Sequence, residues 1–313
     1  MLDLQGSNIS KKQSAVIGRL KRDWQLWVFV IPGLVLTFIF SYVPIYGIQI
    51  AFRRFSARAG IWGSRWAGLD HFERFFNSPN FITTFSNTFI LSVYSLAASF
   101  PIPIILALML NSFRRKKFGK LIQNVTYAPH FISVVVMCGM ITLFLSPSTG
   151  VINTILGYLG IGPINFMAER GMWRSIYVWT GVWQNCGWDS VIYFAALSSV
   201  SPDLHEAAIV DGATKFQRII HIDLPSIMPV ASILLILNAG NLFSLGFEKA
   251  FLLQNDLNLS MSEIIPTYVY KVGLLQNDMS YSTAINLFNS VINSVLLLSV
   301  NKITGKMSGS SLW

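Results

Sequence analysis

Aromatic and polar side chains recur at helical spacing between residues 179 and 189 of this sequence. Trp179 and Trp183 are four residues apart, and Asn185, Trp188 and Asp189 form a second set of the same kind. Side chains three or four residues apart lie on one face of a helix. Aromatic rings pack against the apolar faces of sugar rings, while amides and carboxylates hydrogen-bond hydroxyl groups. These residue types are compatible with binding of a polar molecule such as a sugar.

Amide side chains form similar sets later in the chain. Asparagines in apolar helices face a wet pathway or hydrogen-bond a neighbouring helix, and their spacing is compatible with both roles. Both roles remain open for these asparagines. Glu248, an acid that follows the fifth apolar stretch, is also expected to belong to the pathway. The additional candidate pathway residues are Asn238, Asn241, Glu248, Asn286, Asn289 and Asn293.

Tryptophans at the ends of apolar stretches have a simpler interpretation. They commonly form a belt at the membrane–water interface. Trp173 and Trp179 suit that role, so Trp179 has two candidate roles.

The sequence contains no recognisable catalytic constellation. The four histidines, His71, His130, His205 and His221, are scattered, and no Gly-x-Ser-x-Gly or His-Glu-x-x-His pattern occurs. The phosphate-binding pattern G-x4-G-K-[ST] is also absent. We expect a non-enzymatic chain that holds no metal or cofactor of its own, so work must be driven by a partner or by a gradient.

The composition indicates the class of protein that must position these residues. Of the 313 residues, 53% are apolar and only 12% are charged, and the mean hydropathy is +0.53. A soluble protein carries about twice that share of charge. The chain is therefore expected to be an integral membrane protein, and intrinsic disorder is excluded.

Six uncharged or nearly uncharged stretches are long enough to cross a bilayer, which takes about 20 helical residues. Asp189 is the sole charge inside them. Pro101 and Pro103 are expected to kink the second stretch. The predicted spans are Trp27–Ile50, Phe85–Leu110, Val125–Leu145, Ile176–Val200, Met228–Phe247 and Thr283–Val300.

The distribution of basic residues predicts the orientation. With the N-terminus inside, the cytoplasmic segments hold 14 of the 23 Lys and Arg residues, which favours cytoplasmic N- and C-termini. The net charge of +9 is then explained by orientation and lipid contact, without nucleic acid. The cytoplasmic residues are Lys11, Lys12, Arg19, Lys21, Arg22, Arg114, Arg115, Lys116, Lys117, Lys120, Lys215, Arg218, Lys302 and Lys306.

The connection between the fourth and fifth spans does not look like a loop. Ser201 and Pro202 form a helix start, with a hydroxyl cap and proline in the first turn. Gly212 provides a left-handed stop, and Thr214–Ile222 has helical apolar spacing before Pro225 breaks the pattern. Two short cytoplasmic helices are expected. Their residue types alone are also compatible with an amphipathic hairpin on the bilayer.

Particular residues distinguish these alternatives. Glu206-Ala207-Ala208, Gly212 and Ile222-Asp223-Leu224-Pro225 match E-A-A-x3-G-x9-I-x-L-P without a departure. This segment resembles the signature loop of permease subunits in ATP-binding-cassette importers. The span pattern is similar to the carbohydrate-importing branch that takes up oligosaccharides and uronate-containing polysaccharides.

The resemblance implies an all-α, six-transmembrane-helix type I importer permease core. The implied domains are a cytoplasmic segment 1–23, a permease domain 24–304 with its coupling loop 201–226, and a cytoplasmic tail 305–313. It also implies a bacterial cytoplasmic membrane protein with a second, similar but nonidentical permease, two ATPase subunits that bind ATP and magnesium, and an extracytoplasmic binding protein. The implied cargo is an oligosaccharide, with uronate-containing chains included; another small polar solute and a gradient-driven carrier are the alternatives.

The resemblance also assigns roles within the loop. Glu206 would pair with a basic ATPase residue, and Ala207 and Ala208 would let the partner backbone approach closely. The remaining residues would set the chain reversal and the exit into the fifth span. The implied coupling residues are Glu206, Ala207, Ala208, Asp211, Gly212, Ile222, Leu224 and Pro225.

The first outer loop is rich in arginine, with Arg53, Arg54, Arg58, Arg65 and Arg74. This charge suits an acidic saccharide and equally suits docking of an acidic binding protein. Sequence alone leaves both interpretations open.

Overall fold

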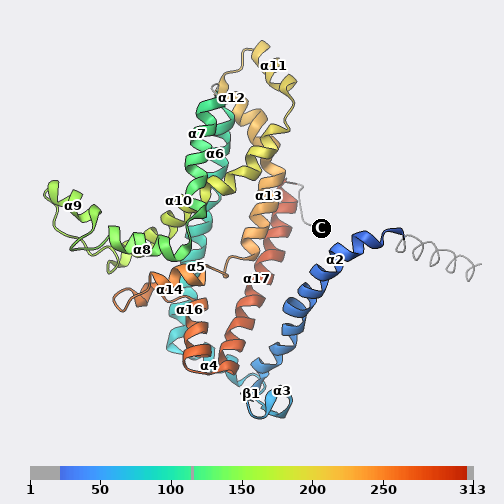
Figure 1. Ribbon diagram of the computed structural model, residues 1–313, viewed down its shortest axis with the longest axis vertical. Helices are drawn as coiled ribbons and strands as arrows, with labels where there is room; N and C mark the ends of the chain where they lie inside the picture. Colours follow the sequence, from blue (N-terminus) through green and yellow to red (C-terminus); the bar gives the residue numbers. More distant parts are fainter. Residues whose placement is uncertain (1–21, 114–115, 309–313) are drawn as a thin grey trace, which may run out of the picture. The chain divides into compact units, whose positions relative to one another are not determined.

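The computed structural model describes residues 22–113 and 116–308 and divides the chain into two compact units, Met1–Gly68 and Leu69–Trp313 (Figure 1). Most of the predicted N-terminal segment and part of the predicted tail therefore lie outside the described residues. So do Arg114 and Arg115 of the second basic cluster.

The first unit contains the first predicted span. The chain is helical from Trp24 to Phe52, through α2 (Trp24–Thr37), the π-helical η1 (Phe38–Tyr42) and the 3₁₀-helical η2 (Val43–Phe52). The most apolar stretch of this helix has no buried side chain. An apolar surface of this length suits lipid contact.

A small hairpin follows and departs from the all-α expectation. Strand β1 (Arg53–Ser56) pairs antiparallel with β2 (Ser64–Trp66), and the short helix α3 (Gly60–Gly63) lies in the connection. The register places Arg54 opposite Arg65. Like charges directly opposite each other destabilise a strand pair.

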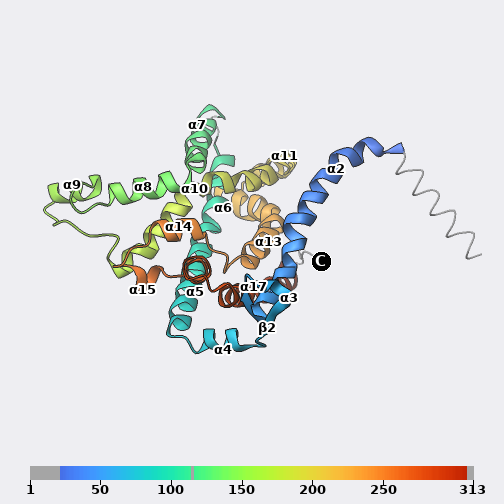
Figure 2. The ribbon, with the colours of Figure 1, turned by 60° about the horizontal axis from the view of Figure 1, so that its bottom comes forward.

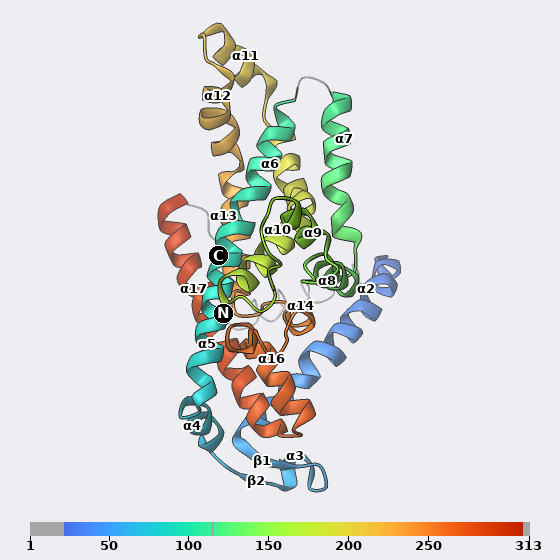
Figure 3. The same ribbon diagram turned by 90° about the vertical axis from the view of Figure 1, so that its left-hand side faces the viewer.

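The second unit is built around α10 (Arg170–Ser198). This helix packs against α5 (Pro79–Ser99), α6 (Pro101–Asn111), α7 (Lys116–Tyr127) and α13 (Leu224–Gly240). The predicted fourth span therefore lies at the centre of this unit (Figure 3).

Helix α17 (Met279–Ser308) runs alongside α13 and continues beyond both ends of the sixth predicted span. The two helices lie side by side in Figures 1 and 3. Gly240 allows close contact here, because a Cβ at this position would overlap the Leu297 side chain. The absence of a side chain at residue 240 thus sets how closely α13 and α17 approach.

The second predicted span is one helical path from Pro79 to Asn111 that is interrupted at Phe100. Pro101 follows directly and cannot donate a backbone hydrogen bond to the preceding turn. Phe100 keeps helical backbone angles and its amide donates to the Leu96 carbonyl, so the kink expected from Pro101 and Pro103 stays a prediction.

The third predicted span was wrong as a single straight helix. Lys117–Phe131 and Val134–Phe144 meet at a bend of 97°. Pro129 lies in the short helix η3 (Ala128–Phe131), and the Ser133 hydroxyl then caps α8 (Val134–Phe144). A proline and a new cap stop the first helix and start another, which runs toward α9 (Val151–Tyr158) in Figure 2.

The fifth predicted span was wrong at its outer end, because α13 ends at Gly240 rather than at Phe247. Asn241 consequently lies in the turn after α13 and does not share a helix face with Asn238. Glycine has low helix propensity and permits this ending.

Shorter helices surround these long ones in the second unit. Most of them fill connections in which no helix was expected, and the last three named here lie within the loop predicted to be helical. They are α4 (Asp70–Phe76), α14 (Phe247–Leu252), α15 (Leu259–Ser262), α16 (Ile265–Tyr270), η5 (Lys271–Leu275), α11 (Pro202–Val210), α12 (Lys215–Arg218) and η4 (Ile219–Asp223).

Length and composition qualify four helices as membrane-crossing within the described residues, or five if the bent pair is one span. Helix α10 has 29 residues but is not apolar enough to be among them, because its face carries the amides, tryptophans and acid noted above. The fourth predicted span is therefore the most polar of the six, and it lies at the centre of the second unit.

Candidate coupling loop and transmembrane pathway

Helix α11 starts and ends as its sequence predicts. The Ser201 hydroxyl accepts a hydrogen bond from the Asp203 amide, and Pro202 lies in the first turn. At the other end Gly212 has φ +79°, while the amides of Gly212 and Ala213 donate to the carbonyls of Ile209 and Ala208. This pair of hydrogen bonds is a Schellman ending, which requires a residue in the left-handed region.

The second half of the loop differs from the expectation at its exit. Thr214 and Gln217 form a reciprocal capping box at the start of α12. The chain then remains helical from Lys215 to Gly240, so Pro225 does not break it. The π-helical turn η4 precedes Pro225, which lies in the first turn of α13, where proline is tolerated.

Contacts to the neighbouring helices hold the loop. His205 Nε2 lies 3.2 Å from Oδ1 of the buried Asp223, and the Nδ2 of Asn111 donates to the same oxygen at 3.4 Å. The Lys215 ammonium donates to the Ser112 carbonyl at the end of α6, at 2.7 Å. A cation is favourable at a helix C-terminus.

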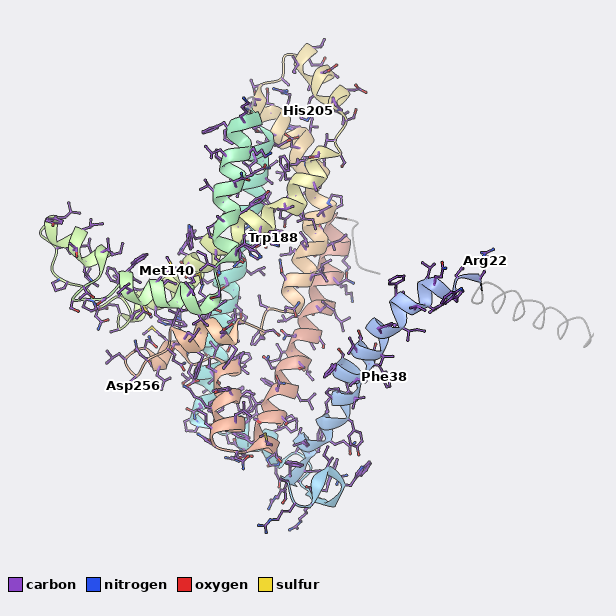
Figure 4. The ribbon with its side chains drawn as sticks, viewed as in Figure 1. Arg22, Phe38, Met140, Trp188, His205 and Asp256 are labelled. Atoms are coloured by element: carbon purple, nitrogen blue, oxygen red, sulfur yellow. The ribbon has the colours of Figure 1, made fainter. Side chains whose placement is uncertain are left out.

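The outer surface of α11 is uncovered. It has no buried residue; Glu206 and Ala207 are exposed, and Val210 is 87% exposed. Figure 4 labels His205 on this helix, at the same end of the second unit as α12 and the tips of α6 and α7. An exposed surface that combines apolar and acidic side chains typically marks a protein contact.

Two adjoining cavities follow α10 through the second unit. The first, about 370 Å³, is lined by side chains from α5, α8, α10 and α14; the second, about 560 Å³, by α5, α6, α10 and α13. Ser99 and Asp189 line both cavities. Of the predicted pathway residues, Asn185 and Asp189 line the first, and Trp188, Asp189 and Asn238 line the second.

An aromatic stack lies beside these cavities. The His130 ring stacks on Trp188 with centroids 4.7 Å apart and planes within 1°, and His130 Nδ1 lies 3.0 Å from Asn185 Oδ1. Phe131 meets Trp188 edge to face. Trp188 is 48% exposed and is labelled in Figure 4. The sequence did not indicate His130 as part of this group, because its local pattern does not show that η3 packs against α10.

Asn289 and Asn293 have helix-packing contacts. The Asn289 amide donates to the Phe243 carbonyl, Asn293 Oδ1 accepts from the Phe243 amide, and Asn293 Nδ2 donates to Ser244 Oγ. These bonds fix the turn after α13 onto α17. Neither residue lines the two cavities, so the geometry favours the packing role left open above.

The other candidate pathway residues lie outside both cavities, and their pathway role stays a prediction. Trp179 donates to Tyr94 Oη at 2.9 Å, while Trp183 and Asn286 are exposed. Asn241 lies in the turn after α13. The belt role of Trp173 was wrong: this side chain is fully buried and donates to the Leu253 carbonyl.

The structure places Lys249, rather than its neighbour Glu248, at a cavity. Glu248, the predicted pathway acid, is exposed, whereas Lys249 is 9% exposed and lines the first cavity. Helix α14 was not expected, so neither side chain could be placed on a helical face in advance. The sequence feature that could have identified Lys249 is the adjacent acid and base, Glu248 and Lys249, at the end of an apolar stretch.

Fold and site together describe a helical membrane protein with a projecting loop and two cavities beside its central helix. The sequence profile of the binding-protein-dependent transport system inner membrane component family matches residues 99–308, and the chain belongs to this family. The match contains α6, α10, α13, α17 and the whole coupling loop.

Two relatives align with this chain over nearly its full length. Protein LplB of Bacillus subtilis (strain 168) is 40% identical, over 94% of this chain and 92% of its own length. The polygalacturonan/rhamnogalacturonan transport system permease protein YteP of the same organism is 38% identical, over 97% of this chain and 94% of that protein.

A solved structure is similar over nearly the whole chain. It is described as a bacterial alginate ABC transporter in complex with an alginate pentasaccharide-bound periplasmic protein. A chain of that structure is 37% identical, with a TM-score of 0.86 covering 94% of this chain and 98% of the other.

Proposed function

We propose that this chain is the membrane-spanning permease subunit of an ATP-driven importer for acidic oligosaccharides. It would receive its cargo from an extracytoplasmic binding protein and take its energy from two separate ATPase subunits, which bind ATP and magnesium. A second, similar but nonidentical permease would complete the pathway. The N- and C-termini would be cytoplasmic, in a bacterial cytoplasmic membrane.

The uncovered helix α11 is the observation that carries this proposal. It is terminated at both ends by its own sequence and anchored at its base, yet it exposes Glu206, Ala207 and Val210. A membrane protein that lacks the G-x4-G-K-[ST] pattern must receive work from elsewhere. A rigid helix presented on a fixed base can transmit motion from an ATPase as a rigid body.

The relatives support an acidic saccharide as cargo. YteP is named for polygalacturonan and rhamnogalacturonan, and the similar structure concerns alginate. These are uronate-containing polymers. In this chain the hairpin of the first unit carries Arg54 opposite Arg65, and this concentration of positive charge suits an acidic partner or ligand.

Purification of the chain from its native membrane tests the assignment. The expected result is co-purification of an ATPase and a second permease, and uptake of uronate oligosaccharides by the reconstituted complex with its binding protein and ATP. Uptake driven by an ion gradient in the purified subunit alone would instead establish a carrier. ATP-driven uptake restricted to another small polar solute would support the assignment as an importer subunit and contradict the assignment of a saccharide as its cargo.

A further inference from the structure

A buried lysine opens into the first cavity. Lys249 lies on α14, and its Nζ donates to the backbone carbonyl of Tyr177 on α10 at 2.6 Å. The same Nζ lies 4.8 Å from the centre of the Tyr177 ring. Within the described residues no carboxylate forms an ion pair with it.

The surroundings accommodate this ammonium closely. Gly181 lies one turn beyond Tyr177, and a Cβ there would lie 3.0 Å from Lys249 Nζ. Because Gly181 has no side chain, the Lys249 ammonium can reach the Tyr177 backbone carbonyl on α10. An ammonium has three donors, and the structure assigns a hydrogen bond to one of them.

A second polar group in the same cavity lacks a partner. The Ser95 hydroxyl, on α5, is buried and has no hydrogen-bond partner within the described residues. Ser95 and Lys249 both line the 370 Å³ cavity. Buried polar atoms are nearly always hydrogen-bonded. Unused donors on Lys249 of α14 and Ser95 of α5 therefore point to a ligand that accepts hydrogen bonds from both.

The charge of this ligand follows from its neighbours. A buried, unpaired ammonium is costly in a membrane protein, and a negative partner offsets that cost. Glu248 is exposed, and Asp189 lines the cavity without pairing with Lys249. The available donors thus suit an anion supplied from outside the chain. A carboxylate accepts several hydrogen bonds at once.

We infer that Lys249 and Ser95 form a transient subsite for the carboxylate of a uronate residue as the saccharide passes along α10. This inference rests on the proposed import function and adds a residue-level basis for its acidic cargo. Asp189 lies at the junction with the second cavity, where its negative charge would disfavour prolonged retention of the anion. Conduction requires binding that is weak enough to release.

The test compares two ligands on the complete importer in detergent, without its binding protein. One probe is a uronate tetrasaccharide, and the other is its neutral methyl ester. Loss of a hydrogen-bonded charge predicts a roughly 10- to 100-fold rise in Kd for the uronate in Lys249→Gln, with little change for the ester. Lys249→Arg should keep most of the binding.

Further variants separate binding from folding. Ser95→Ala removes one hydroxyl and should weaken uronate binding by roughly three- to tenfold, again without affecting the ester. Lys302→Gln removes an exposed charge from α17 and serves as the charge control. Complexes with unchanged thermal unfolding are compared, so that a folding defect is not read as a binding defect.

The outcomes distinguish this subsite from the import function itself. Equal weakening of both probes, or unchanged uronate binding in Lys249→Gln and Ser95→Ala, overturns the subsite. If the wild-type complex imports neutral saccharides with ATP but does not bind uronate, the importer stands and the acidic subsite is removed. A complex that imports no saccharide at all contradicts the proposed function.

Discussion

His205 Nε2 and Asp223 Oδ1 lie 3.2 Å apart, so the first helix of the coupling loop is tied to the turn that leads into α13. Asp223 is 3% exposed, which makes this contact part of the packed base of the loop. The residues that follow in α13 contact α10 and α17. Movement of α11 is therefore expected to reach the helices that border the pathway.

Replacement of His205 by alanine should loosen this connection. Among the residues that the structure describes, the longer hydrogen bond from Asn111 then remains for the buried Asp223 carboxylate, at a cost of about 1–3 kcal/mol. We expect the importer to assemble but to transport several-fold less substrate per ATP hydrolysed. His205→Gln, which can still donate a hydrogen bond, is the matched control. Unchanged transport per ATP in His205→Ala would show that the contact plays no part in coupling.

Valine at Gly212 should disturb the end of α11 through backbone conformation alone. The position has φ +79° and a Cβ added there would meet no atom within 4 Å, so the expected cost is about 1–2 kcal/mol of strain. Gly160 provides a matched control, with φ +77° and equally open surroundings outside the loop. We expect similar losses of thermal stability in both variants, but loss of ATP-driven transport only in Gly212→Val. Equal transport in both would remove the special role of Gly212.

Replacement of Asn289 by alanine tests the packing role against the pathway role. It removes the hydrogen bond to the Phe243 carbonyl and should lower stability by about 1 kcal/mol, measured by thermal unfolding in detergent. The substrate concentration that half-stimulates ATPase activity should not change. Asn77→Ala, which removes an exposed amide that is not a candidate pathway residue, is the control for amide removal. A shifted concentration dependence in Asn289→Ala would place this side chain in the pathway instead.

The parts of the structure that short-range chemistry determines were predictable. The hydroxyl of Ser201 and the conformational freedom of Gly212 set both ends of α11 within a few residues, without help from the rest of the fold. The grouping of Asn185, Trp188 and Asp189 at the two adjoining cavities follows in the same way from helical periodicity.

The remaining features depend on contacts between distant segments. Hydropathy alone does not show that the third predicted span bends after Phe131 or that η3 packs against α10, so the stacking of His130 on Trp188 was missed. The amide of Asn289 faces the turn containing Phe243 because α13 stops at Gly240, which periodicity did not indicate. Lys249 was overlooked because its helix, which packs against α8 and α16, was not expected from the sequence.

Charge reversal at Glu206 tests the coupling account most directly. The side chain is exposed on α11, so Glu206→Lys should leave insertion and folding intact while it repels the basic partner surface expected on the ATPase. Asp256→Lys makes the same charge change at an exposed position in the turn after α14 and serves as the control. The measurement is ATP-driven uptake in liposomes at equal amounts of reconstituted subunit. The account predicts wild-type uptake in Asp256→Lys and at least roughly tenfold lower uptake in Glu206→Lys; wild-type uptake in Glu206→Lys would contradict it.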